Sequence, residues 1–186
     1  MNAALNYFDE SLFRGWDARD GFFAQKALLS HYNGAAKLHM TWITPEDTEE
    51  DRQRKAAFFE NWKNWRACLD LAKTKPEKTA FHYLLRKPDD FLGFIYEIPA
   101  EILRAYYAGY QAYLWNKIVK MAVDSGIESQ IAGIEIPLFS ERSVMPSADL
   151  QMIERQILHA EKIDRSLIGL TKFRKVRLMP GSRRAL

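Results

Sequence analysis

The amino-acid sequence predicts an α+β fold that is rich in helix through its middle and has strands near its end. Repeated helix starts, in which Thr or Asp stands beside Pro and acidic residues, mark several helices between residues 44 and 124. Two later stretches, 133–139 and 166–179, alternate their side chains as strands do. A chain of 186 residues that is 47% apolar is long enough to bury a sizeable core.

The first predicted helices come in two groups. Residues 21–43 are predicted to form two short helices separated at Asn33-Gly34, a dipeptide typical of turns. Thr44 has the features of an N-cap, with Asp47 three residues beyond it, so a new helix is predicted to run to about Ala72. Its apolar side chains recur at steps of three and four and predict a stripe facing the core: Phe58, Trp62, Trp65, Leu69 and Ala72.

The later elements have clearer boundaries. Thr74 with Glu77 is a capping pattern that predicts a helix through Arg86, and the sequence KPDD at 87–90 predicts the next helix start. The longest predicted helix runs from Pro99 to Asp124 and stops at a Ser-Gly pair. The last predicted elements are a strand at 133–139, a helix at 147–162 and a hairpin or edge strand at 166–179.

The longest helix is predicted to bury one stripe of side chains: Leu103, Tyr107, Tyr110, Leu114, Ile118 and Met121. About a quarter of a turn away, a second line contains Arg104, Ala108, Gln111 and Trp115. Ala108 and Gly109 are small, which leaves room for another segment to approach the helix backbone. Gln111 and Asn116 have two interpretations: they satisfy buried backbone groups of neighbouring loops, or they line a binding site. The residues by themselves favour the first.

Composition excludes several classes of protein. Cys68 is the only cysteine, so an internal disulfide is excluded, and the four histidines show no metal-ligand spacing with each other or with Cys68. We therefore predict no metal site. No apolar run approaches the roughly 18 residues that cross a bilayer, and the first residues lack the features of a signal peptide. These features predict a cytoplasmic protein without a membrane partner.

Positive charge is concentrated at the end of the chain. The net charge of +3 is small, but residues 162–186 carry eight basic side chains against the single acid Asp164: Lys162, Arg165, Lys172, Arg174, Lys175, Arg177, Arg183 and Arg184. Such a segment either keeps the chain soluble or contacts the phosphates of a nucleic acid. The charge alone leaves both interpretations open.

Two motifs resemble one known family. The sequence AYYAGYQAYLWN at 105–116 resembles the A-Y-Q-S-Y-L-W-N or A-x-R-S-x-L-F-N signature helix of the TruD family of pseudouridine synthases. Its matching positions are Tyr110, Gln111, Tyr113, Leu114, Trp115 and Asn116, and Ala112 stands where the family usually has serine. The sequence NYFDESLFRG at 6–15 is similar to the family segment N-Y-F-D/G-x-Q-R-F-G, with departures at Ser11, Leu12 and Arg14.

The resemblance covers most of the chain and implies its organisation. It implies a helix-rich inserted TruD domain together with parts of a pseudouridine synthase catalytic core built on a mixed sheet. Residues 1–20 would be a remnant of the catalytic core, and residues 21–165 the inserted, mostly helical domain. Residues 166–186 would be a basic strand that returns to the catalytic core, because FRKVRLMPGSRRAL resembles the family's return strand and the arginine segment after it.

The activity implied by the resemblance is the isomerisation of a uridine in tRNA to pseudouridine, with no metal and no cofactor. The reaction needs an aspartate that attacks the ribose or assists elimination, and the family carries it in a G-x-K-D motif upstream of the N-Y-F segment. No G-x-K-D occurs among the 186 residues, so we assign no catalytic residue. An enzyme is implied by family, but this chain is expected to be inactive alone.

The expected substrate-binding residues come from the two motifs and the basic end. The resemblance implies Asn6 and Phe8 beside the target base. Arg104, Gln111 and Asn116 are expected to order the wall of the site. The basic end supplies the expected phosphate contacts Arg174, Arg177, Arg183 and Arg184.

The implied partners are tRNA and a separate chain that carries the catalytic aspartate. Three origins stay open: one half of a split gene, a fragment, or a decayed copy. The alternative function is a non-enzymatic helical module that binds RNA or protein. A neighbouring reading frame that encodes a G-x-K-D segment favours the split enzyme, and its absence favours the module.

Overall fold

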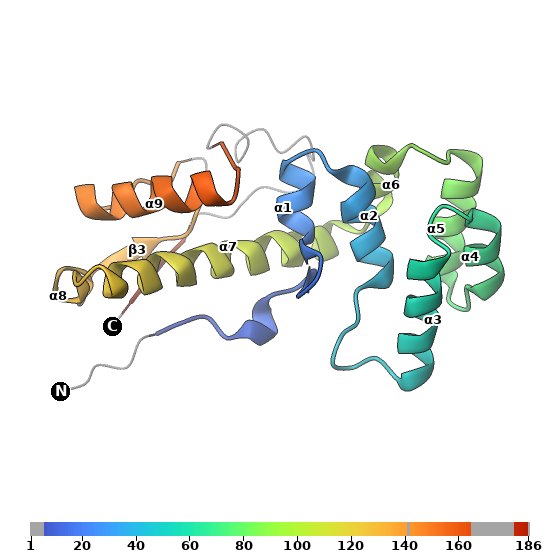
Figure 1. Ribbon diagram of the computed structural model, residues 1–186, viewed down its shortest axis with the longest axis horizontal. Coiled ribbons are helices and arrows are strands. Elements are labelled where there is room, and N and C mark those ends of the chain that lie inside the picture. Colours follow the sequence, from blue (N-terminus) through green and yellow to red (C-terminus); the bar gives the residue numbers. More distant parts are fainter. Residues whose placement is uncertain (1–5, 141, 165–180, 186) are drawn as a thin grey trace. The chain divides into compact units, whose positions relative to one another are not determined.

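The computed structural model describes residues 6–140, 142–164 and 181–185. Contacts divide the chain into two compact units. The inserted unit is Gly15–Ile102, and the two-segment unit combines Met1–Arg14 with Leu103–Leu186. Figure 1 gives the elements of both units along the sequence. The predicted division into segments 1–20, 21–165 and 166–186 follows other bounds and stays a prediction.

The inserted unit opens on a short antiparallel ladder of β1 (Trp16–Asp17) and β2 (Gly21–Phe22). Helices follow it: α1 (Phe23–Leu28), α2 (Tyr32–Thr41), α3 (Glu49–Glu60), α4 (Trp65–Leu71), α5 (Lys75–Arg86) and α6 (Phe91–Glu97). Their buried side chains include Phe23, Leu38, Phe58, Cys68, Phe81, Leu84 and Ile95. Helices this short are marginal in isolation, so packing against one another stabilises them.

The predicted break at Asn33-Gly34 is wrong. The chain turns between α1 and α2 at Ser30, which adopts a φ of 61°, and Asn33 and Gly34 lie in the first turn of α2. A Cβ at Gly34 would stand 3.2 Å from the side-chain Cδ of Lys26. The glycine therefore gives room to a neighbouring side chain, and a left-handed serine makes the turn.

The predicted helix from Thr44 to Ala72 is also wrong in two places. The Asp47 carboxylate accepts from the Thr44 N–H at 2.7 Å, which forms a turn, and the capping box that starts α3 belongs to Thr48 with Asp51. The chain then breaks between α3 and α4, where Lys63 has a φ of 80°. The spacing of the apolar residues could not show that the helix starts at Thr48 rather than at Thr44. It also could not show that Lys63 adopts a left-handed conformation and interrupts the helix.

Two other predicted helix starts are confirmed. Thr74 and Glu77 form a capping box at the start of α5, in which each side chain meets the backbone amide of the other residue. The Asp90 side chain caps α6 by accepting from the Gly93 N–H at 2.9 Å. Both caps satisfy amides that a helix start leaves without partners.

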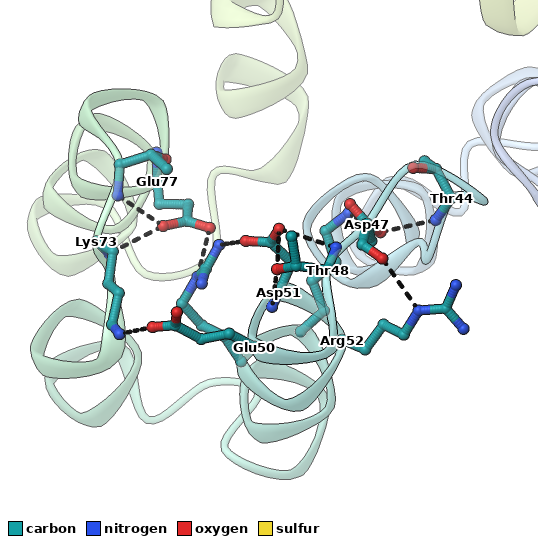
Figure 2. Close-up of polar contacts among 11 residues, drawn as sticks. Thr44, Asp47, Thr48, Glu50, Asp51, Arg52, Lys73 and Glu77 are labelled. Atoms are coloured by element: carbon teal, nitrogen blue, oxygen red, sulfur yellow. Dashed lines mark hydrogen bonds and ion pairs between the residues drawn. The ribbon is translucent and has the colours of Figure 1, made fainter.

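One buried arginine joins the capping boxes of α3 and α5. Arg54, 8% exposed, donates from Nε to Glu77 at 2.9 Å and from Nη2 to Asp51. Figure 2 shows this junction, with a second ion pair between Lys73 and Glu50 beside it. The two acids thus cap their own helices and hold the same guanidinium, so α3 and α5 are linked by charge as well as by apolar packing.

The same hydrogen bonds keep both acids ionised. Donation from Thr48 and Arg54 lowers the pKa of Asp51 to about 2. Burial alone would raise the pKa of Glu77, but backbone N–H groups and Arg54 hold that pKa below its ordinary value. The junction therefore needs both carboxylates charged, and acid weakens it.

The two-segment unit is built around one long helix. Its elements are η1 (Glu10–Leu12), α7 (Ala100–Asp124), whose first turn belongs to the inserted unit, α8 (Glu128–Ile131), β3 (Glu135–Pro137), α9 (Ala148–Ala160) and β4 (Ser182–Arg184). β3 and β4 pair antiparallel, with Ile136 opposite Arg183. The predicted long helix, the strand within 133–139 and the helix within 147–162 are confirmed. The predicted hairpin or edge strand at 166–179 lies outside the described residues.

The predicted stripe of α7 is largely confirmed. Leu103, Tyr107, Tyr110, Leu114 and Ile118 are buried, whereas Met121 is half-buried near the end of the helix. In the second line, Gln111 and Trp115 are buried and Arg104 and Ala108 are exposed. The first line of α7 is thus covered along most of its length, whereas the second is covered at Gln111 and Trp115 and faces solvent at Arg104 and Ala108.

Candidate functional site

The two sequence motifs meet in the two-segment unit. Asn6 and Phe8 of the first motif, Trp115 and Asn116 of the second, and Arg183 of β4 form one contiguous group, which we call the Phe8 cluster. The first and last of these residues are 177 positions apart in the sequence. The cluster therefore depends on the long helix and on the β3–β4 pair to bring its members together.

Asn116 fixes the backbone of Phe8. Its side-chain Oδ1 accepts from the Phe8 N–H at 2.8 Å, and its Nδ2 donates to the Phe8 carbonyl at 2.9 Å. A single amide thereby satisfies both polar groups of one residue, as a neighbouring strand would. This geometry holds the N-terminal segment against α7 and decides where the Phe8 ring lies.

The ring of Phe8 rests against Trp115. Their centroids are 5.3 Å apart and the rings are nearly perpendicular, at 85°. Trp115 is fully buried, and its indole N–H donates to the Ile136 carbonyl of β3 at 3.0 Å. The indole is thus locked by the strand behind it and gives Phe8 a rigid support.

Arg183 covers Phe8 from β4. Its guanidinium carbon lies 4.2 Å from the centroid of the Phe8 ring and 5.8 Å from that of Trp115. Its Nη2 donates to Asn6 Oδ1 at 2.5 Å and to the Tyr7 carbonyl at 3.2 Å. A planar cation over an aromatic ring is a favourable contact, and here it also ties the strand to the N-terminal segment.

Asn6 is held on its other side by the end of β4. The Asn6 N–H donates to the Ala185 carbonyl at 2.9 Å, and its Nδ2 donates to the Arg184 carbonyl at 3.1 Å. Both Asn6 and Arg184 are exposed, whereas Ala185 is fully buried. The amide of Asn6 is therefore ordered at the surface, where a ligand can reach it.

Gln111 takes the backbone-satisfying role that the residues alone favoured. It is 4% exposed, and its Nε2 donates to the Phe139 carbonyl at 2.5 Å. Arg104 is exposed and lies about 10 Å from Gln111 along the helix axis, a distance that follows from seven residues of helical rise. Arg174 and Arg177 lie outside the described residues.

The predicted approach to α7 at its small residues is confirmed at Gly109. A Cβ there would stand 2.7 Å from both the Arg14 N and the Leu12 carbonyl oxygen. Only glycine lets the backbone of 12–14 pass so close to the helix. The Phe13 ring then packs edge-on against Tyr113 at 6.0 Å. The N-terminal segment is thus fixed to α7 both at Phe8 and at residues 12–14.

Asp9 stands between these two attachments. Its carboxylate accepts from the Ser11 N–H at 2.7 Å and caps η1, and hydrogen bonds with the side chain and the backbone of Ser11 lower the pKa of Asp9. An exposed capping acid has an ordinary structural task.

Sequence reasoning missed Glu161. This buried carboxylate at the end of α9 accepts from the Tyr110 hydroxyl at 2.9 Å and from Lys117 Nζ at 2.5 Å, with the Tyr113 hydroxyl at 3.4 Å. Burial, together with Glu161, raises the pKa of Tyr110 far above its ordinary value. Burial alone would lower the pKa of Lys117, but its interactions with Glu161 and Tyr113 outweigh burial and raise that pKa, so the lysine stays protonated.

Trp115 was also missed as a site residue, although it lies within the matched motif. Its position in the second line of α7 was visible, but its contact with Phe8 depends on the path of a distant segment. Within the described ranges, no cluster of three or more His, Cys, Asp or Glu side chains has a metal-binding arrangement. The same ranges contain no helix with the length and apolar character needed to span a membrane.

Comparison with known proteins identifies relatives. Residues 22–133 match the model of the family described as tRNA pseudouridine synthase D (TruD). The probable tRNA pseudouridine synthase D 1 of Methanococcus maripaludis is 25% identical over 123 residues, which are 64% of this chain and 31% of the relative. The tRNA pseudouridine synthase D of Leptospira interrogans is 28% identical over 126 residues, or 63% of this chain and 30% of the relative.

A solved structure supports the same fold. The crystal structure described as a tRNA pseudouridine synthase D (TruD) from Methanosarcina mazei superposes with a TM-score of 0.78 at 17% identity. It covers 98% of this chain, which spans 51% of that protein. The chain thus corresponds to about a third of the curated relatives and half of the solved one. Because the family model matches more than half of its residues, the chain belongs to the TruD family.

Proposed function

We propose that this chain is part of a tRNA pseudouridine synthase and that the Phe8 cluster forms one wall of its uridine site. The observation that carries the proposal is the pairing of Asn116 with Phe8 at 2.8 and 2.9 Å, which joins the two TruD-like motifs. Family membership of residues 22–133 supports the same activity. Because the proposed substrate is tRNA, we expect the protein to act in the cytoplasm.

The chemistry of the cluster suits an extruded uridine. An ordered surface amide at Asn6 can hydrogen-bond the edge of a uracil, and the half-buried Phe8 offers an aromatic contact. Arg184, exposed at the end of β4, supplies positive charge for a phosphate. Asn116 and Trp115 then serve the site indirectly, because they hold Phe8 in place. Gln111 supports the same wall through the Phe139 carbonyl.

The isomerisation breaks the bond between ribose C1′ and N1 of the uracil and forms one between C1′ and C5. C5 loses a proton and N1 gains one, so the reaction needs no oxidant or reductant. The aspartate that attacks C1′ or assists elimination would come from a G-x-K-D segment, and none occurs in the 186 residues. We propose that a separate chain supplies it, and that this chain contributes the binding wall.

The second candidate is a binding module without catalysis. Asp9, the aspartate within the N-Y-F segment, is engaged as the N-cap of η1. A chain that keeps the binding wall and has no nucleophile of its own would bind RNA without changing it. The two candidates differ in whether a partner chain with a G-x-K-D segment restores pseudouridine formation.

Binding and modification of tRNA test the proposal together. The purified chain is expected to bind tRNA with an affinity that falls steeply as salt rises, and to form no pseudouridine alone. Replacing Phe8 with leucine should weaken binding about fivefold or more, the lower limit for loss of one base–aromatic contact, without changing the salt dependence. The measurements are filter-binding titrations at several salt concentrations and carbodiimide-based mapping of pseudouridine.

Phe59→Leu is the matched control, because Phe59 is also partly exposed, at 37%, but lies in the inserted unit. It should bind tRNA as the unchanged chain does. Equal binding by the Phe8→Leu variant and the unchanged chain would remove the Phe8 cluster from the proposed uridine site. Pseudouridine formed by the chain alone would show that an aspartate within it is catalytic.

A further inference from the structure

We infer that Arg183 is a positioning residue, which holds Asn6 and Phe8 in the geometry that meets the uridine, and that Arg184 is the phosphate-binding residue of β4. The inference rests on the proposed function, since it divides the work of two adjacent arginines at the proposed site. By charge alone the two arginines are equivalent, but their side chains have different surroundings.

The side chain of Arg183 is directed toward its own chain. One nitrogen, Nη2, donates to Asn6 Oδ1 at 2.5 Å and to the Tyr7 carbonyl at 3.2 Å. The face of the guanidinium lies over Phe8, with 4.2 Å between its central carbon and the ring centroid. Arg183 thus contacts three consecutive residues of the N-Y-F motif at once. A phosphate ligand would have to compete with these contacts for the same group.

The strand gives Arg184 the opposite orientation. Side chains alternate between the two faces of a strand. Accordingly, Arg183 is half-buried, whereas its neighbours Ser182 and Arg184 are exposed. The backbone carbonyl of Arg184 accepts from Asn6 Nδ2 at 3.1 Å, so its main chain is ordered while its side chain faces solvent. An exposed cation on an ordered backbone is suited to a phosphate contact.

The register of the β3–β4 pair fixes the position of the Arg183 backbone. Ile136, fully buried, lies opposite Arg183, and its carbonyl accepts from the Trp115 indole at 3.0 Å. Trp115 in turn supports the Phe8 ring at 5.3 Å. Arg183 and Trp115 therefore hold Phe8 from two elements that are themselves connected at Ile136. Loss of the guanidinium removes one of these two supports.

Replacing Arg183 with lysine separates the two roles. Lysine keeps the positive charge but lacks the planar group that stacks on a ring and donates in two directions. If Arg183 positions the motif, both Arg183→Lys and Arg183→Ala weaken tRNA binding about tenfold, within the range expected for a lost base–aromatic contact. If it binds phosphate, Arg183→Lys binds as the unchanged chain does, and that result would overturn the inference.

Arg184 provides the matched comparison. Arg184→Lys should bind tRNA like the unchanged chain, because a lysine also serves as a phosphate contact. Arg184→Ala should lower the magnitude of the log-log salt slope by about one, the effect of one lost phosphate contact. An unchanged slope for Arg184→Ala would overturn the assignment of phosphate binding to Arg184. All four variants are compared in the full 186-residue chain.

A second measurement does not depend on RNA. The Phe8 and Trp115 rings should shift the side-chain proton resonances of Arg183 upfield in NMR spectra of the free chain, and Phe8→Leu should move them back. Resonances of Arg183 at ordinary positions in the unchanged chain would overturn the inference. Amide spectra of the variants show whether the rest of the chain has kept its fold.

The two failures are distinguishable. Normal binding by Arg183→Lys, together with weakened binding by Phe8→Leu, removes the positioning role and leaves the proposed function intact. Normal binding by Phe8→Leu contradicts the proposed function, and the role of Arg183 in RNA binding falls with it.

Discussion

Replacing Arg54 with methionine is expected to lower the free energy of unfolding by about 3 kcal/mol, the lower end for a broken buried ion pair. The Arg54 side chain is 8% exposed and donates to Asp51 and Glu77, the acidic members of two capping boxes. Methionine leaves both carboxylates without their shared cation. Urea unfolding followed by tryptophan fluorescence measures the effect, because four of the five tryptophans lie in the inserted unit: Trp16, Trp42, Trp62 and Trp65.

Arg52→Met is the matched control on the same helix. Arg52 is exposed, and its Nε donates to the Asp47 carbonyl at 3.2 Å. We expect it to change the free energy of unfolding by no more than about 0.5 kcal/mol, as surface substitutions usually do. If both variants lowered the free energy of unfolding by similar amounts, the ion pairs of Arg54 with Asp51 and Glu77 would not be the source of its stabilising effect.

The contribution of the Arg54 junction should also depend on pH in one direction. The pKa of Asp51 is lowered to about 2 in the folded chain, and that of Glu77 is lowered as well. Such acids stabilise the fold fully above their unfolded pKa of roughly 4, and lose that contribution as pH falls toward the folded value. The difference between unchanged chain and Arg54→Met is therefore expected to be largest near neutral pH and to shrink below about pH 4.

Replacing Glu161 with alanine is the second large effect, with an expected loss of about 3 kcal/mol in the free energy of unfolding. Glu161 is 7% exposed and accepts from Tyr110, Tyr113 and Lys117. Its removal leaves a lysine and a buried tyrosine hydroxyl without their acceptor. Amide hydrogen exchange along α7 should speed up most around residues 110–117, where these donors lie.

A double variant separates the charge from the packing. Glu161→Gln with Lys117→Met removes both members of the ion pair, and should be less destabilising than Glu161→Ala because no charge is left unpaired. Glu128→Ala, at an exposed glutamate of the same unit, should cost no more than about 1 kcal/mol. A double variant less stable than Glu161→Ala would contradict the ion-pair explanation.

Local chemistry predicted most of the helices. Thr74 with Glu77, Asp90 before α6, and Pro99 before α7 are short-range signals, and the structure confirms each of them. The helix boundaries that were predicted wrongly have a local cause as well. At α3, Thr48 with Asp51 competes with Thr44 and Asp47, and the sequence spacing of both pairs is the same. The left-handed residues Ser30 and Lys63 end helices without a glycine.

The site was predictable only where a motif marks it. Asn6, Phe8 and Asn116 were named from their motifs, and in the structure Arg183 contacts Asn6 and Phe8 while Asn116 hydrogen-bonds Phe8. Gln111 shows the other case, since helical spacing placed it on the right face but left its partner, the Phe139 carbonyl, unknown. The contacts of Arg183 and Glu161 join residues far apart in the sequence. The periodic spacing of residues along the chain cannot predict such pairs, because they arise when whole helices and strands pack together.

Photo-crosslinking tests most directly whether the Phe8 cluster meets a uridine. Transfer RNA that carries 5-iodouridine is bound to the chain, irradiated, and the crosslinked peptide is identified by mass spectrometry. We predict a uridine adduct on residues 6–8, which Phe8→Leu abolishes while Phe59→Leu leaves it unchanged. Adducts confined to the inserted unit, or equal adducts on residues 6–8 in both variants, would contradict the assignment of the Phe8 cluster to the uridine site.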